Sequence, residues 1–327
     1  MIEIEADGNI SSFIQALKEN TIHIDINQET WFRGQPDYTH KLFPSIFRNN
    51  INNSPQFDQV EMYEEADMYA EFIRRYPEHS NNHKNVFEWL TLMQHYRLPT
   101  RLLDWTTNLL VALFFCCNEE KDKDGAIFVF NPVSDLSLPN DFGKFLEIQV
   151  TSYDKTLFYE QLFMLSDNAF GEETKINGIK IKDIKNDVGY KISSICNVSR
   201  CFEAFESLEK FHGIDQYVSL IDNFSDIYTF RPPHLNHRIR QQHGCFTFHG
   251  GKFFEGWEFI KTFNMDNQYK LVKIKVNSED KPRILTELNL CGIYEATLFP
   301  EMEYQSKQIR DRYRNIYTLF KGTPILY

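Results

Sequence analysis

Apolar residues repeat at helical spacing in several separate stretches of the chain. Phe13 and Leu17 belong to a pattern that predicts a helix over residues 11–19, with Ser12 as its N-cap. The same spacing predicts four further helices, over residues 57–76, 86–96, 281–289 and 302–317. A helix that begins near Asn108 is apolar nearly all round, so we expect it to be buried.

Other short runs are rich in β-branched and aromatic residues, which predicts strands. These runs are residues 21–26, 31–35, 126–132, 244–250, 259–263 and 270–276. Gly34 and Pro36 end the second run, so Arg33 and Gln35 lie near the end of a strand. Residues 49–55 (NNINNSP) predict a polar loop.

Helical and strand patterns of this kind predict one α+β domain over residues 1–327. We expect a central mixed or antiparallel β-core, built from about residues 25–135 and 229–300, with flanking helices. Residues 136–228 are less regular and rich in Asp, Asn and Lys. They predict a mostly helical insertion or cap over the core.

Composition narrows the class of protein. The chain has 327 residues, 35 basic and 46 acidic side chains and a formal charge of −11, which disfavours nucleic-acid binding through bulk positive charge. An anionic ligand would therefore need a local cluster of cations. No apolar run reaches the ~20 residues of a membrane helix, and no secretory signal is visible, so we expect a cytoplasmic location and no membrane partner.

Six cysteines occur without a CxxC pair, so we expect reduced and mostly buried thiols. Four histidines lie between residues 234 and 249, but no zinc-binding spacing accompanies them, and we expect no metal. P-loop, dinucleotide-binding and nucleophile-elbow motifs are also missing from the sequence. Kinase, Rossmann dehydrogenase and α/β-hydrolase chemistry are therefore disfavoured.

Three groups of polar residues lie within otherwise apolar, structure-forming sequence. The first is Arg33-Gly34-Gln35, where a glycine beside an arginine would let a phosphate or carboxylate approach closely. A structural arginine paired with a carboxylate is the alternative.

The second group comprises Gln94-His95, Thr100-Arg101 and Asp104-Trp105-Thr106. Arg101 and Asp104 are close enough in sequence to pair, and a paired arginine beside Trp105 suggests a clamp or a stacking platform. Thr106 or Thr107 is either a ligand-binding hydroxyl or the N-cap of the helix that follows. His95 is either a general base or a histidine with a local capping or core role.

The third group runs from Arg231 to His249 and gathers much of the scarce positive charge, including Arg238 and Arg240. Basic residues, amides and glycine leading into a strand suit recognition of a phosphate-bearing ligand. A salt-bridged strand entry that compensates the acidic surface is the alternative.

Five stretches are informative when taken together: WFRGQ (31–35), LMQHYRLPTRLLDWTTNLLVALFFC (92–116), GAIFVFNP (125–132), RIRQQHGCFTFH (238–249) and GIYEATLFPEME (292–303). They resemble the FRG domain, a bacterial family named for a Phe-Arg-Gly motif, here Phe32-Arg33-Gly34. The resemblance spans about residues 25–315 and implies a single FRG domain. The family name says little about function.

The order of three pieces also resembles ADP-ribosyltransferases of the arginine type, which implies an ADP-ribosyltransferase-like β-core. Arg33-Gly34 matches a strand with Arg-Gly, and residues 105–107 match a hydroxyl-rich turn before an Ala/Phe-rich helix. Gln242 occupies the place of the catalytic glutamate. An amide there binds a ribose hydroxyl but cannot act as a base. Another acid would then have to serve, with Glu295, Glu301 and Glu303 as candidates.

This resemblance implies roles for individual residues. Arg33 would hold the NAD pyrophosphate, Thr106 or Trp105 the nicotinamide–ribose region, and Gln242 would face the oxocarbenium-like centre. The candidate catalytic residues are Arg33, Thr106, Gln242 and His95. The candidate NAD-binding residues are Gly34, Gln35, Arg101, Asp104, Trp105, Arg238 and Arg240.

We therefore expect a cytoplasmic, NAD-utilising ADP-ribosyltransferase-like enzyme that acts as a bacterial toxin or phage-defence effector. NAD would be its substrate, a nucleic acid or protein its acceptor, and an antitoxin its neutralising partner. One alternative is a nucleotide- or nucleic-acid-binding module, or a nuclease that uses His95, His249 and residues 231–240. Another is a regulatory protein whose polar groups are all structural.

Overall fold

The computed structural model describes residues 1–20, 24–48, 51–53, 58–60, 63–132, 150–151, 175–176, 179–180, 227–233, 236–250, 265 and 270–314. The helical insertion expected over residues 136–228 and the strand expected over 259–263 lie almost entirely outside this part of the chain. Within the former, β7 (Lys175–Ile176) and β8 (Ile179–Lys180) pair as a short antiparallel ribbon.

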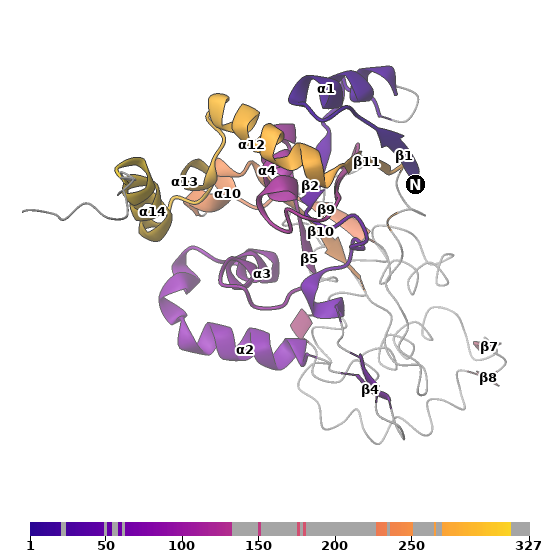
Figure 1. The fold of residues 1–327 in the computed structure, drawn as a ribbon. Coiled ribbons are helices and arrows are strands. Elements are labelled where there is room, and N and C mark those ends of the chain that lie inside the picture. Colours follow the sequence, from indigo (N-terminus) through magenta and orange to yellow (C-terminus); the bar gives the residue numbers. More distant parts are fainter. Residues whose placement is uncertain are drawn as a thin grey trace, which may run out of the picture.

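A seven-stranded sheet forms the centre of the molecule (Figure 1). Its strands are β1 (Ile2–Glu5), β2 (Trp31–Gln35), β5 (Leu102–Thr106), β6 (Gly125–Phe130), β9 (Ile227–Phe230), β10 (Gly244–His249) and β11 (Val272–Val276). Their order is β1-β11-β6-β2-β5-β10-β9. The β1–β11 pair is parallel and the other pairs are antiparallel. This mixed sheet and its helices confirm the expected α+β class.

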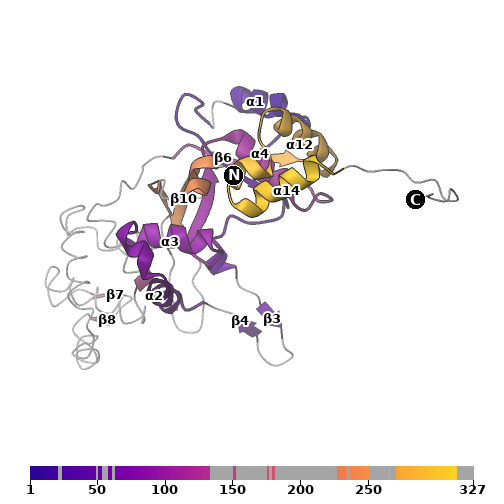
Figure 2. The ribbon, with the colours of Figure 1, turned by 90° about the vertical axis from the view of Figure 1, so that its left-hand side faces the viewer.

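The helices form two groups, which Figures 1 and 2 show at opposite ends of the sheet. One group contains α1 (Ile10–Glu19), α4 (Leu109–Asn118), α12 (Lys281–Leu290), α13 (Glu295–Leu298) and α14 (Met302–Arg312). The other contains α2 (Glu65–Arg75) and α3 (Val86–His95). The short α10 (His237–Gln241) leads into β10, and three 3₁₀ turns lie at Ser45–Phe47, Pro77–Asn81 and Ser278–Asp280. Among the described helices, none has the length and apolar character needed to cross a membrane.

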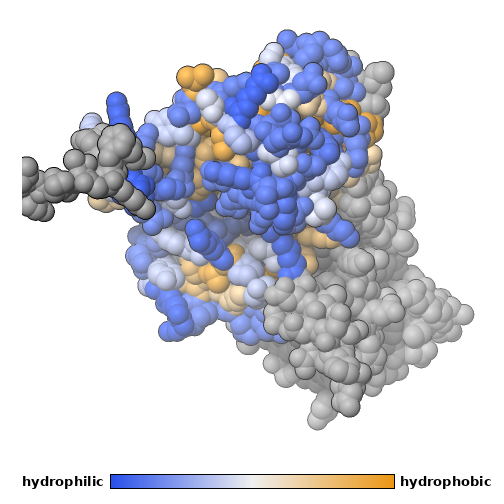
Figure 3. Space-filling model, in the orientation of Figure 1, coloured by the Kyte–Doolittle hydropathy of each residue, from blue (hydrophilic) through white to orange (hydrophobic). Residues whose placement is uncertain are grey.

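Alternation along the strands divides the core between the two faces of the sheet. On β6, Ile127 and Val129 pack with α4, α1 and α12, whereas Ala126, Phe128 and Phe130 point to the opposite face. Helix α3 covers strands β5, β10 and β9 on the same face of the sheet that α4 covers. The coloured part of the face drawn in Figure 3 is mostly hydrophilic.

Several expectations about single elements are wrong. Ile51–Asn53 (β3) pairs with Asp58–Val60 (β4), where a polar loop and the start of a helix were expected. Residues 24–26 are not in a strand, and the cap of α1 is Asn9, whose side chain accepts a hydrogen bond from the Ser12 amide. Strand β1 was not expected at all.

Candidate functional site

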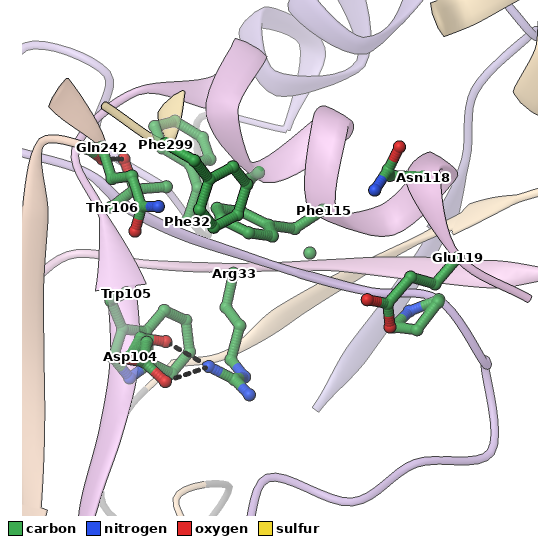
Figure 4. Close-up of a pocket in the computed structure, with 13 residues that line it drawn as sticks. Phe32, Arg33, Asp104, Trp105, Thr106, Phe115, Asn118, Glu119, Gln242 and Phe299 are labelled. Atoms are coloured by element: carbon green, nitrogen blue, oxygen red, sulfur yellow. Dashed lines mark hydrogen bonds and ion pairs between the residues drawn. The ribbon is translucent and has the colours of Figure 1, made fainter. Parts of the chain in front are cut away.

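A pocket of about 210 Å³ lies where the central sheet opens between β2 and β5. Strand β2 pairs with β6 along its whole length, but with β5 only through Phe32 and Thr106. The strands diverge beyond that pair, and α4 and the chain after α13 complete the walls. The pocket is lined by Phe32, Arg33, Gly34, Pro36, Asp104, Trp105, Thr106, Ala112, Phe115, Asn118, Glu119, Gln242 and Phe299 (Figure 4).

The Phe-Arg-Gly motif places its three residues on two faces of β2. Phe32 and Gly34 face α4, and Arg33 faces the other side. A Cβ on Gly34 would lie 1.8 Å from the carbonyl oxygen of Ala112. The glycine therefore permits close contact between strand and helix. From the sequence, Gly34 was assigned to ligand approach, and this packing role was missed.

Arg33 is largely buried at the open end of β2. Its Nη1 donates to the backbone oxygen of Asp104 at 2.5 Å and lies 3.7 Å from the Asp104 carboxylate (Figure 4). Burial lowers the pKa of Arg33 to about 10, although the charge of Asp104 opposes this shift. Its Nε is buried and has no hydrogen-bond partner. Arg33 thus stays charged at neutral pH with part of its donor capacity unused.

Asp104 and Glu119 are the acidic residues that line the pocket. Asp104 is 62% exposed, and Glu119 follows α4 as its C-cap. In the view of Figure 4, Arg33 lies between them. Glu119 was missed from the sequence, although a polar residue that ends a buried helix beside the Arg-Gly strand was a usable signal. Glu295, Glu301 and Glu303 do not line the pocket.

Thr106 and Gln242 meet at one wall, and their polar groups are already engaged. The Thr106 hydroxyl donates to the Gln242 backbone oxygen at 2.7 Å and accepts from the Asn108 amide at 3.0 Å. The Gln242 side chain donates to the Leu298 carbonyl at 3.1 Å. Asn108, and neither threonine, caps α4. Gln242 follows α10 and precedes β10, so it lies on a turn.

Trp105 is buried, and its indole N–H donates to the Thr247 hydroxyl at 3.0 Å. Its ring meets that of Phe130 edge to face. Arg101 is also buried; its Nε donates to Glu65 at 2.8 Å, and its guanidinium lies over Phe248. The expected Arg101–Trp105 clamp is therefore absent from the described contacts, and Arg101 does not line the pocket.

The other candidates lie beside the pocket or away from it. Arg238 lies over the ring of Phe299, 4.5 Å from its centroid, and so supports a pocket wall. Gln35 is buried and its Nε2 donates weakly to the Lys41 carbonyl, whereas Arg240 is exposed. Neither lines the pocket.

His95 and His249 belong to separate surroundings. His95 lies 4.0 Å from Glu301, and its pKa is lowered by burial and by Arg238, against the effect of Glu301. His249 is fully buried, and desolvation together with Arg33 and Arg101 lowers its pKa to about 3. Both imidazoles are therefore neutral at pH 7. No group of three or more metal-binding side chains occurs in the described part of the chain.

Comparison with known proteins gives one match. The model of the FRG domain matches residues 28–125, which carry eleven of the thirteen residues that line the pocket; the other two are Gln242 and Phe299. No curated protein and no solved structure matches the chain.

Proposed function

We propose that this pocket binds the nicotinamide end of NAD and that the protein breaks the nicotinamide–ribose bond there. The ADP-ribose would pass to a nucleic acid, a protein or water. One observation carries the proposal: a charged, buried arginine, two carboxylates and several aromatic rings meet in one pocket at the opening of the sheet.

The size of the pocket supports binding of one end of the dinucleotide. At about 210 Å³ it is smaller than the ~300–1,000 Å³ of sites that enclose a whole drug-sized ligand. Phe32, Phe115 and Phe299 offer an apolar wall for a flat ring (Figure 4). The phosphates and the adenosine would extend beyond Arg33 toward solvent.

The chemistry requires negative charge near the ribose. As the bond from C1′ to the nicotinamide nitrogen breaks, both electrons leave with nicotinamide, and the ribose becomes positively charged. Asp104 and Glu119 would stabilise that charge in place of the glutamate that Gln242 replaces. The acceptor oxygen or nitrogen then bonds to C1′ and gives its proton to a carboxylate or to water. This arrangement would be an ADP-ribosyltransferase-like site on a mixed sheet.

An enzyme that consumes NAD in the cytoplasm would harm the cell that makes it. We therefore extend the proposal to a toxin or phage-defence effector that is held inactive by a neutralising partner. The nuclease alternative has less support, because fully buried His249 cannot contact a polymer, and Arg238 faces Phe299.

The test is release of nicotinamide, followed by mass spectrometry, when purified protein is incubated with NAD and with RNA, DNA or protein acceptors. Asp104→Asn and Glu119→Gln keep the shape and remove the charge. We expect at least one of them to slow release by about 100-fold, the size typical for loss of one electrostatic contact to a transition state. Asp311→Asn is the matched control, because Asp311 is exposed on α14 away from the pocket. Absence of both NAD binding and nicotinamide release in the wild-type protein would refute the proposal.

A further inference from the structure

Three buried polar atoms on one face of the sheet have no hydrogen-bond partner: Nε of Arg33, Oε1 of Gln35 and Nδ1 of His249. Arg33 and Gln35 are two residues apart on β2 and therefore lie on the same face of the strand. His249 lies on β10 in register with Arg101, which precedes β5. All three side chains point away from α4, because Phe32 and Gly34 occupy the other face of β2. A buried polar atom without a hydrogen-bond partner is costly, so three of them together indicate a missing partner.

The hydrogen bonds around His249 show which of its nitrogens carries the proton. The Trp105 indole can only donate, and it donates to the Thr247 hydroxyl. That hydroxyl lies 2.9 Å from Nε2 of His249 and has its own proton left to donate. We assign that hydroxyl proton to the contact with Nε2, which places the proton of the neutral ring on Nδ1. His249 and Arg33 thus each present an N–H with nothing to accept it.

Positive charge is in excess around these donors. Arg101 is neutralised by Glu65, with both side chains 2% exposed. Arg33 and Arg48 both interact electrostatically with Asp104, which is the carboxylate they share among the described residues. Arg48 follows the 3₁₀ turn at Ser45–Phe47, where its Nε donates to the Phe43 carbonyl at 2.8 Å. Two arginines that share one carboxylate leave a net positive charge, which a bound anion would neutralise.

We propose that this side of the opened sheet binds a phosphate group, with Arg33 and Arg48 as its cationic contacts and the Nδ1–H of His249 as a neutral donor. Arg33 lines the pocket, whereas Arg48, Gln35 and His249 do not, so a ligand would reach them past Arg33 from the opening between β2 and β5. Arginine forks suit the tetrahedral oxygens of a phosphate, and Gln35 Oε1 can accept from a hydroxyl of the same ligand. The subsite adjoins the proposed NAD pocket but does not require that the ligand be NAD or that it be cleaved.

The experiment measures binding of inorganic pyrophosphate, ADP-ribose and nicotinamide by calorimetry. Arg48→Gln removes one cation from an exposed position, so the variant should fold, which circular dichroism checks. We expect it to weaken pyrophosphate and ADP-ribose about tenfold or more, and to leave nicotinamide unaffected. Arg240→Gln, which removes the same charge from exposed α10, is the control and should leave all three affinities unchanged.

A second measurement avoids mutation of the arginines. In protein labelled with ¹⁵N-histidine, pyrophosphate should shift one imidazole Nδ1–H signal, which His249→Gln identifies by its loss. Equal affinities for pyrophosphate in wild type and Arg48→Gln, or no pyrophosphate binding, would overturn the inference even if NAD is cleaved. Conversely, pyrophosphate binding that depends on Arg48, without nicotinamide release, would refute the NAD proposal and leave the phosphate site standing.

Discussion

Replacement of Gly34 by alanine tests the claim that the glycine of the Phe-Arg-Gly motif exists for packing. The added Cβ would lie 1.8 Å from the Ala112 oxygen and 2.8 Å from the Cys116 nitrogen. Both are backbone atoms of α4, so no side-chain rotation relieves the clash. Because Cβ contacts under 3.0 Å essentially never occur, α4 would have to move away from β2 by about 1.2 Å.

Such a movement separates surfaces that are fully buried. Overpacking a core typically costs 1–3 kcal/mol, and a clash with backbone belongs at or above the upper end, so we expect a loss of about 3 kcal/mol or more in the free energy of unfolding. Ala112 and Phe115 line the pocket, so ligand binding should weaken as well.

Urea denaturation followed by circular dichroism measures the change. Gly244→Ala is the control, because its Cβ would meet a flexible methyl group of Ile239 at 3.3 Å, and we expect less than about 1 kcal/mol there. If Gly34→Ala unfolds at the same urea concentration as the wild type, the close packing of α4 on β2 is wrong, and a ligand-approach role for Gly34 regains support.

Three further predictions concern buried charges. Lys281→Met removes an ammonium that donates to three backbone carbonyls and should lower the free energy of unfolding by about 3 kcal/mol, whereas Lys275→Met, at a half-exposed site, should change urea stability little. Glu65→Gln removes the carboxylate that pairs with buried Arg101 and should cost about 3–5 kcal/mol; denaturation equal to that of Glu71→Gln, in an exposed ion pair, would contradict this. Because the folded pKa of His249, about 3, lies below its ordinary value of 6.5, the unfolded chain binds the proton first, and stability present above pH 6.5 is lost as the pH falls toward 3. The slope should approach 1.4 kcal/mol per pH unit, and unfolding measured from pH 6.5 to 4 should show a shallower slope for His249→Phe.

Local patterns predicted most of the helices and strands, because burial on one face leaves a period in the sequence and burial on all sides leaves a continuous apolar run. Residues 109–118 are apolar all round and are buried, and β6 is buried on both faces. Strand β1 was missed although its sequence carries a strand pattern: Ile2 and Ile4 alternate with Glu3 and Glu5. Its partner lies 270 residues away, so nothing nearby supported the assignment.

Single side chains were harder to assign than elements. Arg33, Thr106 and Gln242 were expected together, and the pocket brings them together. Arg101 was expected with them, but its partner Glu65 lies 36 residues earlier at the start of helix α2, and sequence spacing does not reveal such a pair. Whether Thr106 binds a ligand or closes a turn depends on two backbone groups that only the folded chain brings within reach.

The order of strands in the sheet determines when the protein can assemble during synthesis. Segments far apart in the chain alternate across the sheet: β11 lies between β1 and β6, and β10 joins β5 on the far side. The residues that match the FRG domain end at the first residue of β6, before β10 and β11, the outer neighbours of β5 and β6, have been made. A growing chain would expose these edges until Val276 has left the ribosome, and Phe299 closes the pocket later still. The segment that carries the Phe-Arg-Gly motif therefore lacks two of the strands that pair with it in the sheet, and a chain interrupted before residue 299 would carry the motif without the complete pocket.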